Sequence, residues 1–261
     1  MKIREIIGAL EQFAPLSLQD EYDNAGLQIG LTEDADASGA LLCLDVTEEV
    51  IAEAAERGCN LIVAHHPLLF HAPKRIVGDD YVQRCIMQAI RSGIAIYSAH
   101  TNLDNAPGGV SWRMAEKLGL TKVHPLLPLG GGRDGGAGVV GALPTVMERE
   151  DFIALVKETF DADSVRYNSW TGERVKTVAL CGGAGAFLIP EAIDAGADVF
   201  ITGEIGYHRF FGYENDIQLM EIGHYESEQF TLEILREIIT KTDPSLPVFD
   251  TTVETNPINY L

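Results

Sequence analysis

Two adjacent histidines at the end of a short apolar run are the residues of this chain best suited to chemistry. His65 and His66 follow Leu61-Ile-Val-Ala64 and precede Pro67. The apolar run, with two β-branched residues, predicts a buried strand, and Pro67 ends it because proline cannot donate to a sheet ladder. Ligands of open α/β sheets bind at the carboxyl ends of strands. The pair therefore predicts metal ligation, although imidazoles at a strand end can also simply satisfy hydrogen bonds.

Further imidazoles and carboxylates follow two later apolar runs. His100 and Asp104 come after one of them, and His224 and Glu228 come after the other. A spacing of four places His224 and Glu228 on one helix face if a helix has begun there. Imidazoles combined with carboxylates suit Zn, Fe, Ni or Mn better than Ca or Mg. Taken singly, Asp104 also fits an Asx turn, and His224 with Glu228 fit a helix start followed by a solvated charge.

An internal repeat places these groups at equivalent positions. His100-x3-Asp104 is echoed by His224-x3-Glu228 at an offset of 124 residues. A longer echo has an offset of 138 residues and aligns His66 with Glu204. Its first copy is Leu42-Cys-Leu-Asp45 with Gly58-Cys-Asn-Leu-Ile-Val63, and its second is Leu180-Cys-Gly-Gly183 with Gly196-Ala-Asp-Val-Phe-Ile201. The two offsets predict a duplicated α/β unit with an insertion or deletion between the copies.

Helices and strands alternate around these motifs. Apolar spacing and turn residues predict helices at 3–14, 48–57, 79–92, 110–118, 148–160 and 226–240, and strands at 39–46, 61–64, 94–99, 175–180, 198–201 and 217–222. This alternation predicts an α/β fold with mostly parallel mixed sheets. Residues 124–145 are rich in proline and glycine, so they predict a linker or long loop. We therefore place one domain at 1–123 with 220–261, and a second at 124–219.

Composition restricts the partners and the compartment. The formal net charge of −20 argues against nucleic acid and anionic membranes as partners. The four cysteines have no metal-site spacing, which suits buried thiols in a reducing compartment. No run approaches the length of a transmembrane helix, and the first residues lack a signal-peptide core. We expect a cytoplasmic protein.

Five motifs in this order resemble those of the Nif-three-like family of dinuclear-metal proteins, often named GTP cyclohydrolase I type 2 homologues. The motifs are Asp23-Asn-x-Gly-Leu-Gln28, Ala64-His-His-Pro67, Ser98-x-His-x3-Asp104, Thr202-Gly-Glu204 and Gly223-His-x3-Glu228. The resemblance implies metal ligands at His65, His66, Asp104, His224 and Glu228. It also implies two intertwined, duplicated α/β repeats with the metal site in the cleft between them, and a ring-shaped homohexamer. Many relatives carry a middle domain, for which Leu120–Thr145 leaves no room, so the chain resembles the short form.

We therefore expect a dinuclear centre of two divalent transition-metal ions, Zn, Fe, Mn or Ni. His65 and one carboxylate are expected on one ion, and His66 and His224 on or near the other. Asp104 and Glu228 would bridge or cap the ions, while His100 and Glu204 take supporting positions.

The expected function is attack by a metal-activated water on a purine nucleotide or a phosphate ester. The alternative is a metal-dependent scaffold or metal-handling protein that has no substrate, and the residues do not decide between them. A glycine-rich segment, Cys181-Gly-Gly-Ala-Gly185, follows a predicted strand. We expect a plain tight turn there, because no third glycine follows at the Rossmann spacing.

Overall fold

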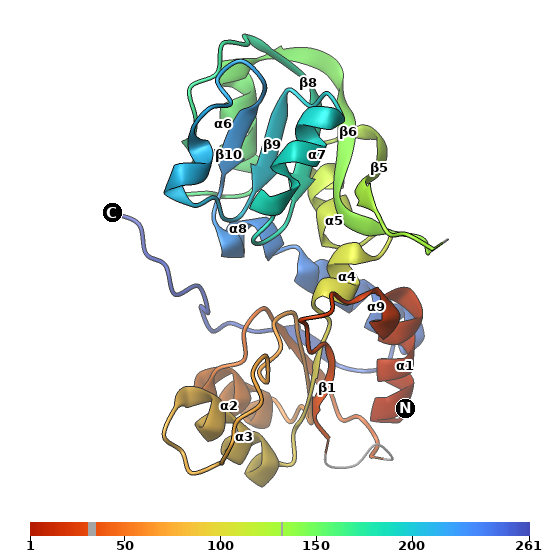
Figure 1. Cartoon of the computed structure of the whole chain (residues 1–261). Coiled ribbons are helices and arrows are strands. Elements are labelled where there is room, and N and C mark those ends of the chain that lie inside the picture. The colour runs from red at the N-terminus through yellow and green to blue at the C-terminus, as the bar shows by residue number, and fades with distance from the viewer. Residues whose placement is uncertain (31–34, 132) are drawn as a thin grey trace. The chain divides into compact units, whose positions relative to one another are not determined.

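Two units make up the chain, and each is built on one mixed β-sheet with parallel central strands. The computed structural model describes residues 1–30, 35–131 and 133–261. Unit 1 comprises Met1–Leu103 and Thr231–Pro257, and unit 2 comprises Asp104–Phe230 and Ile258–Leu261 (Figure 1). The predicted α/β fold with mixed sheets is confirmed.

The sheet of unit 1 has the strand order β1-β4-β3-β2-β11. Strands β4, β3, β2 and β11 are parallel, and β1 is an antiparallel edge strand. Every residue of β2, β3 and β4 is buried, which explains their continuous apolar sequences. The strands are β1 (Gly26–Ile29), β2 (Ala40–Cys43), β3 (Leu61–Ala64), β4 (Ala95–Ser98) and β11 (Val248–Asp250).

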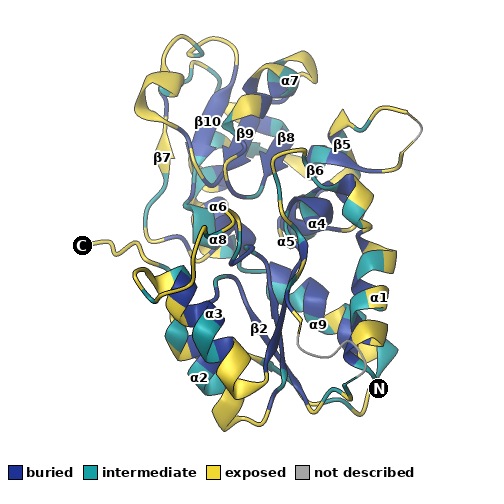
Figure 2. Cartoon of the chain, turned by 60° about the horizontal axis from the view of Figure 1, so that its bottom comes forward, coloured by how far each residue is buried: buried dark blue, intermediate teal, exposed yellow. Residues whose placement is uncertain are grey.

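Helices cover both faces of this sheet, as the buried strands require. Helices α2 (Glu48–Glu56) and α3 (Tyr81–Ser92) share a core with the strand residues Leu41, Ile62 and Ile96. Helix α1 (Ile3–Phe13) packs against α9 (Thr231–Thr242), which also contacts β2 and β11. A short 3-10 turn, Leu16–Leu18, follows α1. Figure 2 shows the strands in the buried colour and the outer sides of the helices as exposed.

The sheet of unit 2 has the strand order β5-β6-β8-β9-β10-β7. Strands β8, β9 and β10 are parallel, and the three outer strands are antiparallel to their neighbours. The strands are β5 (Thr121–Pro128), β6 (Gly136–Glu148), β7 (Arg166–Tyr167), β8 (Arg174–Cys181), β9 (Val199–Thr202) and β10 (Gln218–Glu221).

Two apolar cores lie on the two faces of this second sheet. Helices α5 (Val110–Lys117) and α6 (Arg149–Thr159) contribute Met114 and Phe152 to one core, and α7 (Ile189–Asp194) contributes Ile189 to the other. Shorter helical segments are Ala186–Leu188, Tyr207–Phe210 and α8 (His224–Glu228). Helix α4 (Thr101–Asn105) crosses from unit 1 into unit 2.

The prediction of a loop at residues 124–145 is wrong. Strands β5 and β6 pair there as an antiparallel hairpin, with Pro125 opposite Val139 and Pro128 opposite Gly136. Both prolines lie on an edge strand, where a missing N–H is tolerated. Gly136 is needed because a Cβ at this position would overlap the backbone of Leu127. Proline and glycine therefore mark an edge hairpin here rather than a linker.

The unit boundaries also differ from the predicted domains. Helix α5 packs against β6 and β8, so residues from Asp104 onward belong to unit 2. Strand β10 pairs with β9 near the middle of the second sheet, which keeps the chain in unit 2 as far as Phe230. The helix predicted at 226–240 is divided into α8 and α9, and the Gln229 side chain between them donates to the Phe160 carbonyl.

Strand register supports the internal repeat. Ala40 pairs with Leu61, and Val178 pairs with Val199, and both partners are displaced by the same 138 residues. The offset changes after the second strand, because α3 separates β3 from β4 while only the 3-10 segment Tyr207–Phe210 separates β9 from β10. The insertion that the two offsets predicted is thus the α3 region of unit 1.

All four cysteines are buried free thiols, in agreement with the sequence analysis. Within the described ranges, no helix combines the length and the apolar character that a membrane crossing requires.

Glu53 on α2 supports a test of acid stability. It accepts hydrogen bonds from the hydroxyls of Thr251 and Thr252 and from Arg57. Burial raises its pKa, but these hydrogen bonds outweigh burial and lower the pKa of Glu53 from 4.5 to about 2. A carboxylate with a lowered pKa stabilises the fold above its ordinary pKa, and this contribution disappears as the pH falls through the folded value.

We expect Glu53→Gln to lower the free energy of unfolding by about 1–3 kcal/mol at pH 7. The difference from the unsubstituted chain should shrink as the pH falls from about 5 toward 2. Urea denaturation followed by circular dichroism measures this, with the exposed Glu56→Gln on the same helix as control. Equal effects of the two substitutions would contradict the role of Glu53.

Candidate metal centre

Three histidines of unit 1 come together where parallel strands end. His65 and His66 directly follow β3, and His100 lies two residues beyond β4. One ligand atom from each lies within 4.8 Å of the others. The ring centroid of His65 lies 4.9 Å from that of His66 and 5.3 Å from that of His100. We call these residues the histidine trio.

Each ring of the histidine trio is held through Nδ1. The His65 Nδ1 donates to the Ala99 carbonyl at 2.7 Å, and a carbonyl can only accept, so this nitrogen carries the proton. The His66 Nδ1 lies 2.8 Å from Asp45 Oδ1, and the His100 Nδ1 lies 2.8 Å from Asp23 Oδ1. Acceptors at Nδ1 fix the tautomer that presents an Nε2 lone pair, which is how metal-ligating histidines are usually oriented.

Asp23 is a fixed negative charge behind His100. Its side chain is fully buried, and it accepts from the backbone N–H and the hydroxyl of Thr101 as well as from His100. Burial raises its pKa, but the hydrogen bonds from His100 and Thr101 and the attraction of His100 lower the pKa of Asp23 to about 2. Asp23 is therefore ionised at neutral pH and favours the orientation of His100 described above.

Unit 2 carries a second set of donors on its own parallel strands. His224 begins α8 three residues beyond β10, and Glu204 follows β9 by two residues. The His224 Nδ1 lies 2.7 Å from Glu204 Oε1, and its Nε2 lies 3.1 Å from Glu228 Oε2. Two ligands at about 2.1 Å from a tetrahedral ion are separated by roughly 3.4 Å. The spacing of His224 Nε2 and Glu228 Oε2 thus suits two ligands of one ion, as well as a hydrogen bond.

A glycine-rich turn after β8 packs directly against Glu228. Gly183 has a φ of +61°, and a Cβ at this position would overlap the Glu228 carboxylate. The Gly183 N–H donates to Ser227 Oγ at 2.9 Å, and the Gly185 N–H donates to Thr202 Oγ1 at 2.9 Å. These N–H groups are engaged within the protein, so the turn is structural, as predicted, and holds Glu228 in place.

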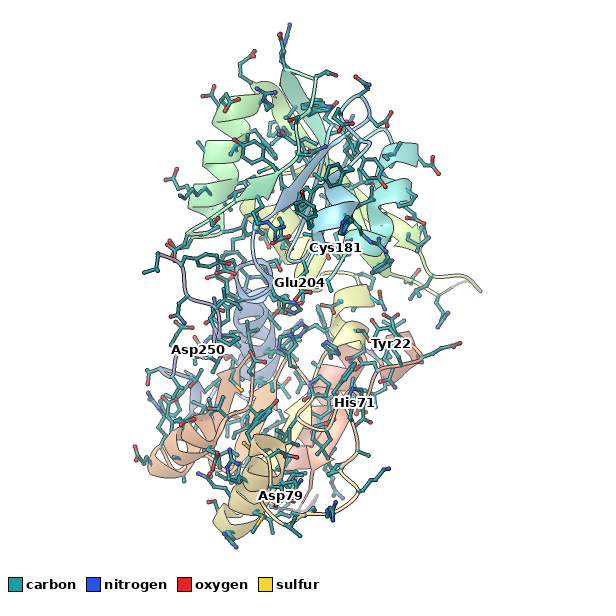
Figure 3. The ribbon with its side chains drawn as sticks, turned by 60° about the vertical axis from the view of Figure 1, so that its left-hand side comes forward. Tyr22, His71, Asp79, Cys181, Glu204 and Asp250 are labelled. Carbon is teal, nitrogen blue, oxygen red and sulfur yellow. The ribbon has the colours of Figure 1, made fainter. Side chains whose placement is uncertain are left out.

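The structure brings together most of the predicted site residues within each unit. His65 joins His66 in unit 1, and His224 joins Glu228 and Glu204 in unit 2 (Figure 3 labels Glu204). Asp104 is half-buried in α4. His100, which the sequence analysis placed in a supporting position, has the same arrangement as His65 and His66.

Two carboxylates of the site were not among the predicted residues. Asp45 lies two residues beyond β2 and holds His66, while Asp23 lies in the turn before β1 and holds His100. Asp45 could have been found from the repeat, since it follows the strand next to the His-His strand. Asp23 begins one of the five motifs of the resemblance, but no spacing in the sequence indicated its contact with His100, which only the tertiary fold brings about.

The chain is similar to known proteins over nearly its whole length. Residues 1–257 match the family Duf34/NIF3 (NGG1p interacting factor 3). A Clostridium perfringens protein named GTP cyclohydrolase 1 type 2 homolog is 38% identical over 229 residues, which cover 87% of each chain. A Staphylococcus epidermidis protein of the same name is 26% identical over an alignment of 368 positions covering both chains entirely, so it is considerably longer than this chain. The crystal structure of Staphylococcus aureus hypothetical protein SA1388 superposes with a TM-score of 0.91 at 29% identity, covering 100% of this chain and 99% of that one.

We expect Gly183→Ala to destabilise the chain by about 2–4 kcal/mol, because it adds overlap with Glu228 to the strain of a positive φ. Gly58→Ala is a matched control, since Gly58 has a φ of +72° with open space around it. Combining Gly183→Ala with Glu228→Ala should remove the excess cost. Urea denaturation of these three variants and of Glu228→Ala alone gives the comparison, and equal costs for Gly183→Ala and Gly58→Ala would contradict the packing argument.

Proposed function

The chain belongs to the Duf34/NIF3 family, and from this premise we propose that it is a metal-dependent hydrolase with a dinuclear centre. The ligands we assign are His65, His66, Asp104, His224 and Glu228, and we add His100 to them. The bound species are two divalent transition-metal ions, and the substrate is a purine nucleotide or a phosphate ester. The relatives named GTP cyclohydrolase 1 type 2 homolog favour the nucleotide.

The histidine trio is the observation that carries this proposal. Three imidazoles with Nδ1 held by a carbonyl and two carboxylates are already oriented for ligation through Nε2. A purely structural cluster would not need all three rings in this tautomer. The donors are nitrogens with nearby carboxylate oxygens, a combination that fits Zn, Fe, Mn or Ni.

The residues of the chain divide the work of such a site. Bound divalent ions would polarise a carbonyl or phosphoryl oxygen and lower the pKa of water. Asp45 and Asp23 hold His66 and His100 in orientation. The Glu204 side chain is 60% exposed and accepts a hydrogen bond from the His224 Nδ1, so we assign it to proton exchange with solvent.

The test measures metal and turnover on the same samples. Purified without chelator, the chain should contain about two transition-metal ions, and it should hydrolyse GTP or p-nitrophenyl phosphate only when metal is present. His66→Ala should reduce turnover at least 100-fold, whereas the exposed His124→Ala should leave it unchanged. Full metal occupancy without turnover would contradict the hydrolase and favour a metal-dependent scaffold or metal-handling protein.

The ligand assignment in unit 2 is tested by Glu228→Gln, His224→Ala and the double substitution. Each single change should lower the affinity for at least one ion by more than 100-fold. Changing a residue that only hydrogen-bonds to a ligand typically lowers it by about 10- to 100-fold. The double variant should lose little more, because both residues serve one site. Metal content after identical dialysis decides this, with the exposed Glu158→Gln as control. Unchanged occupancy in both single variants would refute the assignment.

The homohexamer implied by the resemblance stays a prediction. A chain of net charge −20 needs apolar contacts to outweigh the repulsion between copies, which salt confines to about 8 Å. Light scattering at micromolar concentration should give six times the mass of the chain, and a monomer would contradict the ring.

A further inference from the structure

Two exposed aromatic side chains lie next to the histidine trio in unit 1. Tyr22 is 66% exposed and Phe70 is 39% exposed, and their ring centroids are 6.3 Å apart in an edge-to-face arrangement. The Phe70 ring also lies 6.1 Å from the His100 ring and 4.9 Å from the His71 ring. Single exposed apolar residues are ordinary. An exposed aromatic pair beside a cluster of candidate metal-binding side chains, however, points to a small molecule that binds there.

The loops that carry Tyr22 and Phe70 are fixed to each other. The Asn24 side-chain amide donates to the Leu69 carbonyl at 2.8 Å, and the Leu69 N–H donates to Gln28 Oε1 at 3.0 Å. Tyr22 is further held by its hydroxyl, which donates to Asp20 Oδ2 at 2.9 Å. The two rings are therefore presented in a defined geometry before any ligand arrives, which lowers the entropic cost of binding.

The two loops that carry Tyr22 and Phe70 are also connected to the candidate metal ligands. Asp23, between Tyr22 and Asn24, is the carboxylate that holds His100. A planar ring placed on Phe70 would thus lie one ring away from His100, within reach of chemistry at the trio. The loop that orients His100 through Asp23 therefore also carries Tyr22 of the aromatic pair.

The charges near the pair are unequal. The loop after Phe70 carries Lys74 and Arg75 and no acidic residue before Asp79, in a chain of net charge −20. Both basic residues are exposed. Asp20 and Glu21 precede Tyr22, so the positive charge is confined to the Phe70 side. Tyr22 and His71 are labelled in Figure 3. A ring that bears a phosphate matches aromatic faces on one loop followed by cations on that loop.

We propose that Tyr22 and Phe70 form a stacking platform for the base of a nucleotide, that is, for the heteroaromatic ring of a phosphorylated ligand. The inference rests on the proposed function and deepens it, because it assigns recognition of the base to named residues beside the trio. Stacking on aromatic side chains tolerates different bases, since every base presents a π-face. The platform therefore selects for a ring and against phosphate esters that lack one.

Binding of GMP, CMP and ribose 5-phosphate to the purified chain, measured by calorimetry, tests the platform. Both nucleotides should bind more tightly than ribose 5-phosphate. Tyr22→Leu and Phe70→Leu should each weaken nucleotide binding by about 5- to 150-fold, the range for losing one stacked base contact, and should leave ribose 5-phosphate unaffected. Tyr22→Phe and Phe70→Trp keep a ring, so they should weaken nucleotide binding less than the leucine variants do. Phe13→Leu changes an exposed aromatic residue on α1 as a control.

Equal binding of nucleotides and ribose 5-phosphate, or nucleotide binding unchanged in both leucine variants, would overturn the proposal. Failure to bind either nucleotide would overturn it as well. Metal content and turnover recorded on the same samples keep this result separate from the proposed function. If binding requires the ring and the leucine variants lose it, the platform is supported even if turnover is absent. If the leucine variants keep their nucleotide affinity, their metal content and their turnover, only the platform is removed and the proposed function stands.

Discussion

Parallel pairing of three adjacent strands is the constraint on which both donor sets depend. Parallel strands end at the same edge of a sheet, so the residues that follow them converge without any long side chain having to reach across. In unit 1 the residues after β2, β3 and β4 are Asp45, the His65–His66 pair and His100. Burial of these strands on both faces fixes their register, and the register fixes which side chain is presented at the edge.

The histidine trio depends equally on the acceptors behind it. An imidazole at a strand end can turn about two bonds and can carry its proton on either nitrogen. Ala99, Asp45 and Asp23 remove that freedom, each with a single acceptor atom at Nδ1. These acceptors come from three separate segments, so the orientation of the rings is a property of the folded unit. Preorganisation of this kind lowers the reorganisation needed for ligation.

The two units use one scaffold with different chemistry at equivalent positions. His66 corresponds to Glu204, so the middle strand presents an imidazole in unit 1 and a carboxylate in unit 2. His65 corresponds to Gly203, where a Cβ would come within 2.8 Å of the His224 Cα. The glycine makes room for α8 to begin beside the strand end, and His224 takes over the role of imidazole donor. The strand register is the same in the two units, whereas the residues that follow the strands differ.

The sequence by itself determined the buried strands, the His-His motif, the repeat and the family, because apolar runs, strand ends and ordered motifs are local properties of the chain. It also paired His224 with Glu228, since a spacing of four is enough on a helix. Only the tertiary structure decided that the segment with Pro125 and Pro128 forms an edge hairpin, because tolerance of a missing N–H depends on which strand has a free edge. It alone brought Asp23 to His100, and Tyr22 to Phe70, across long separations in the chain. Such contacts are set by how sheets and loops pack, and no spacing in the sequence records them.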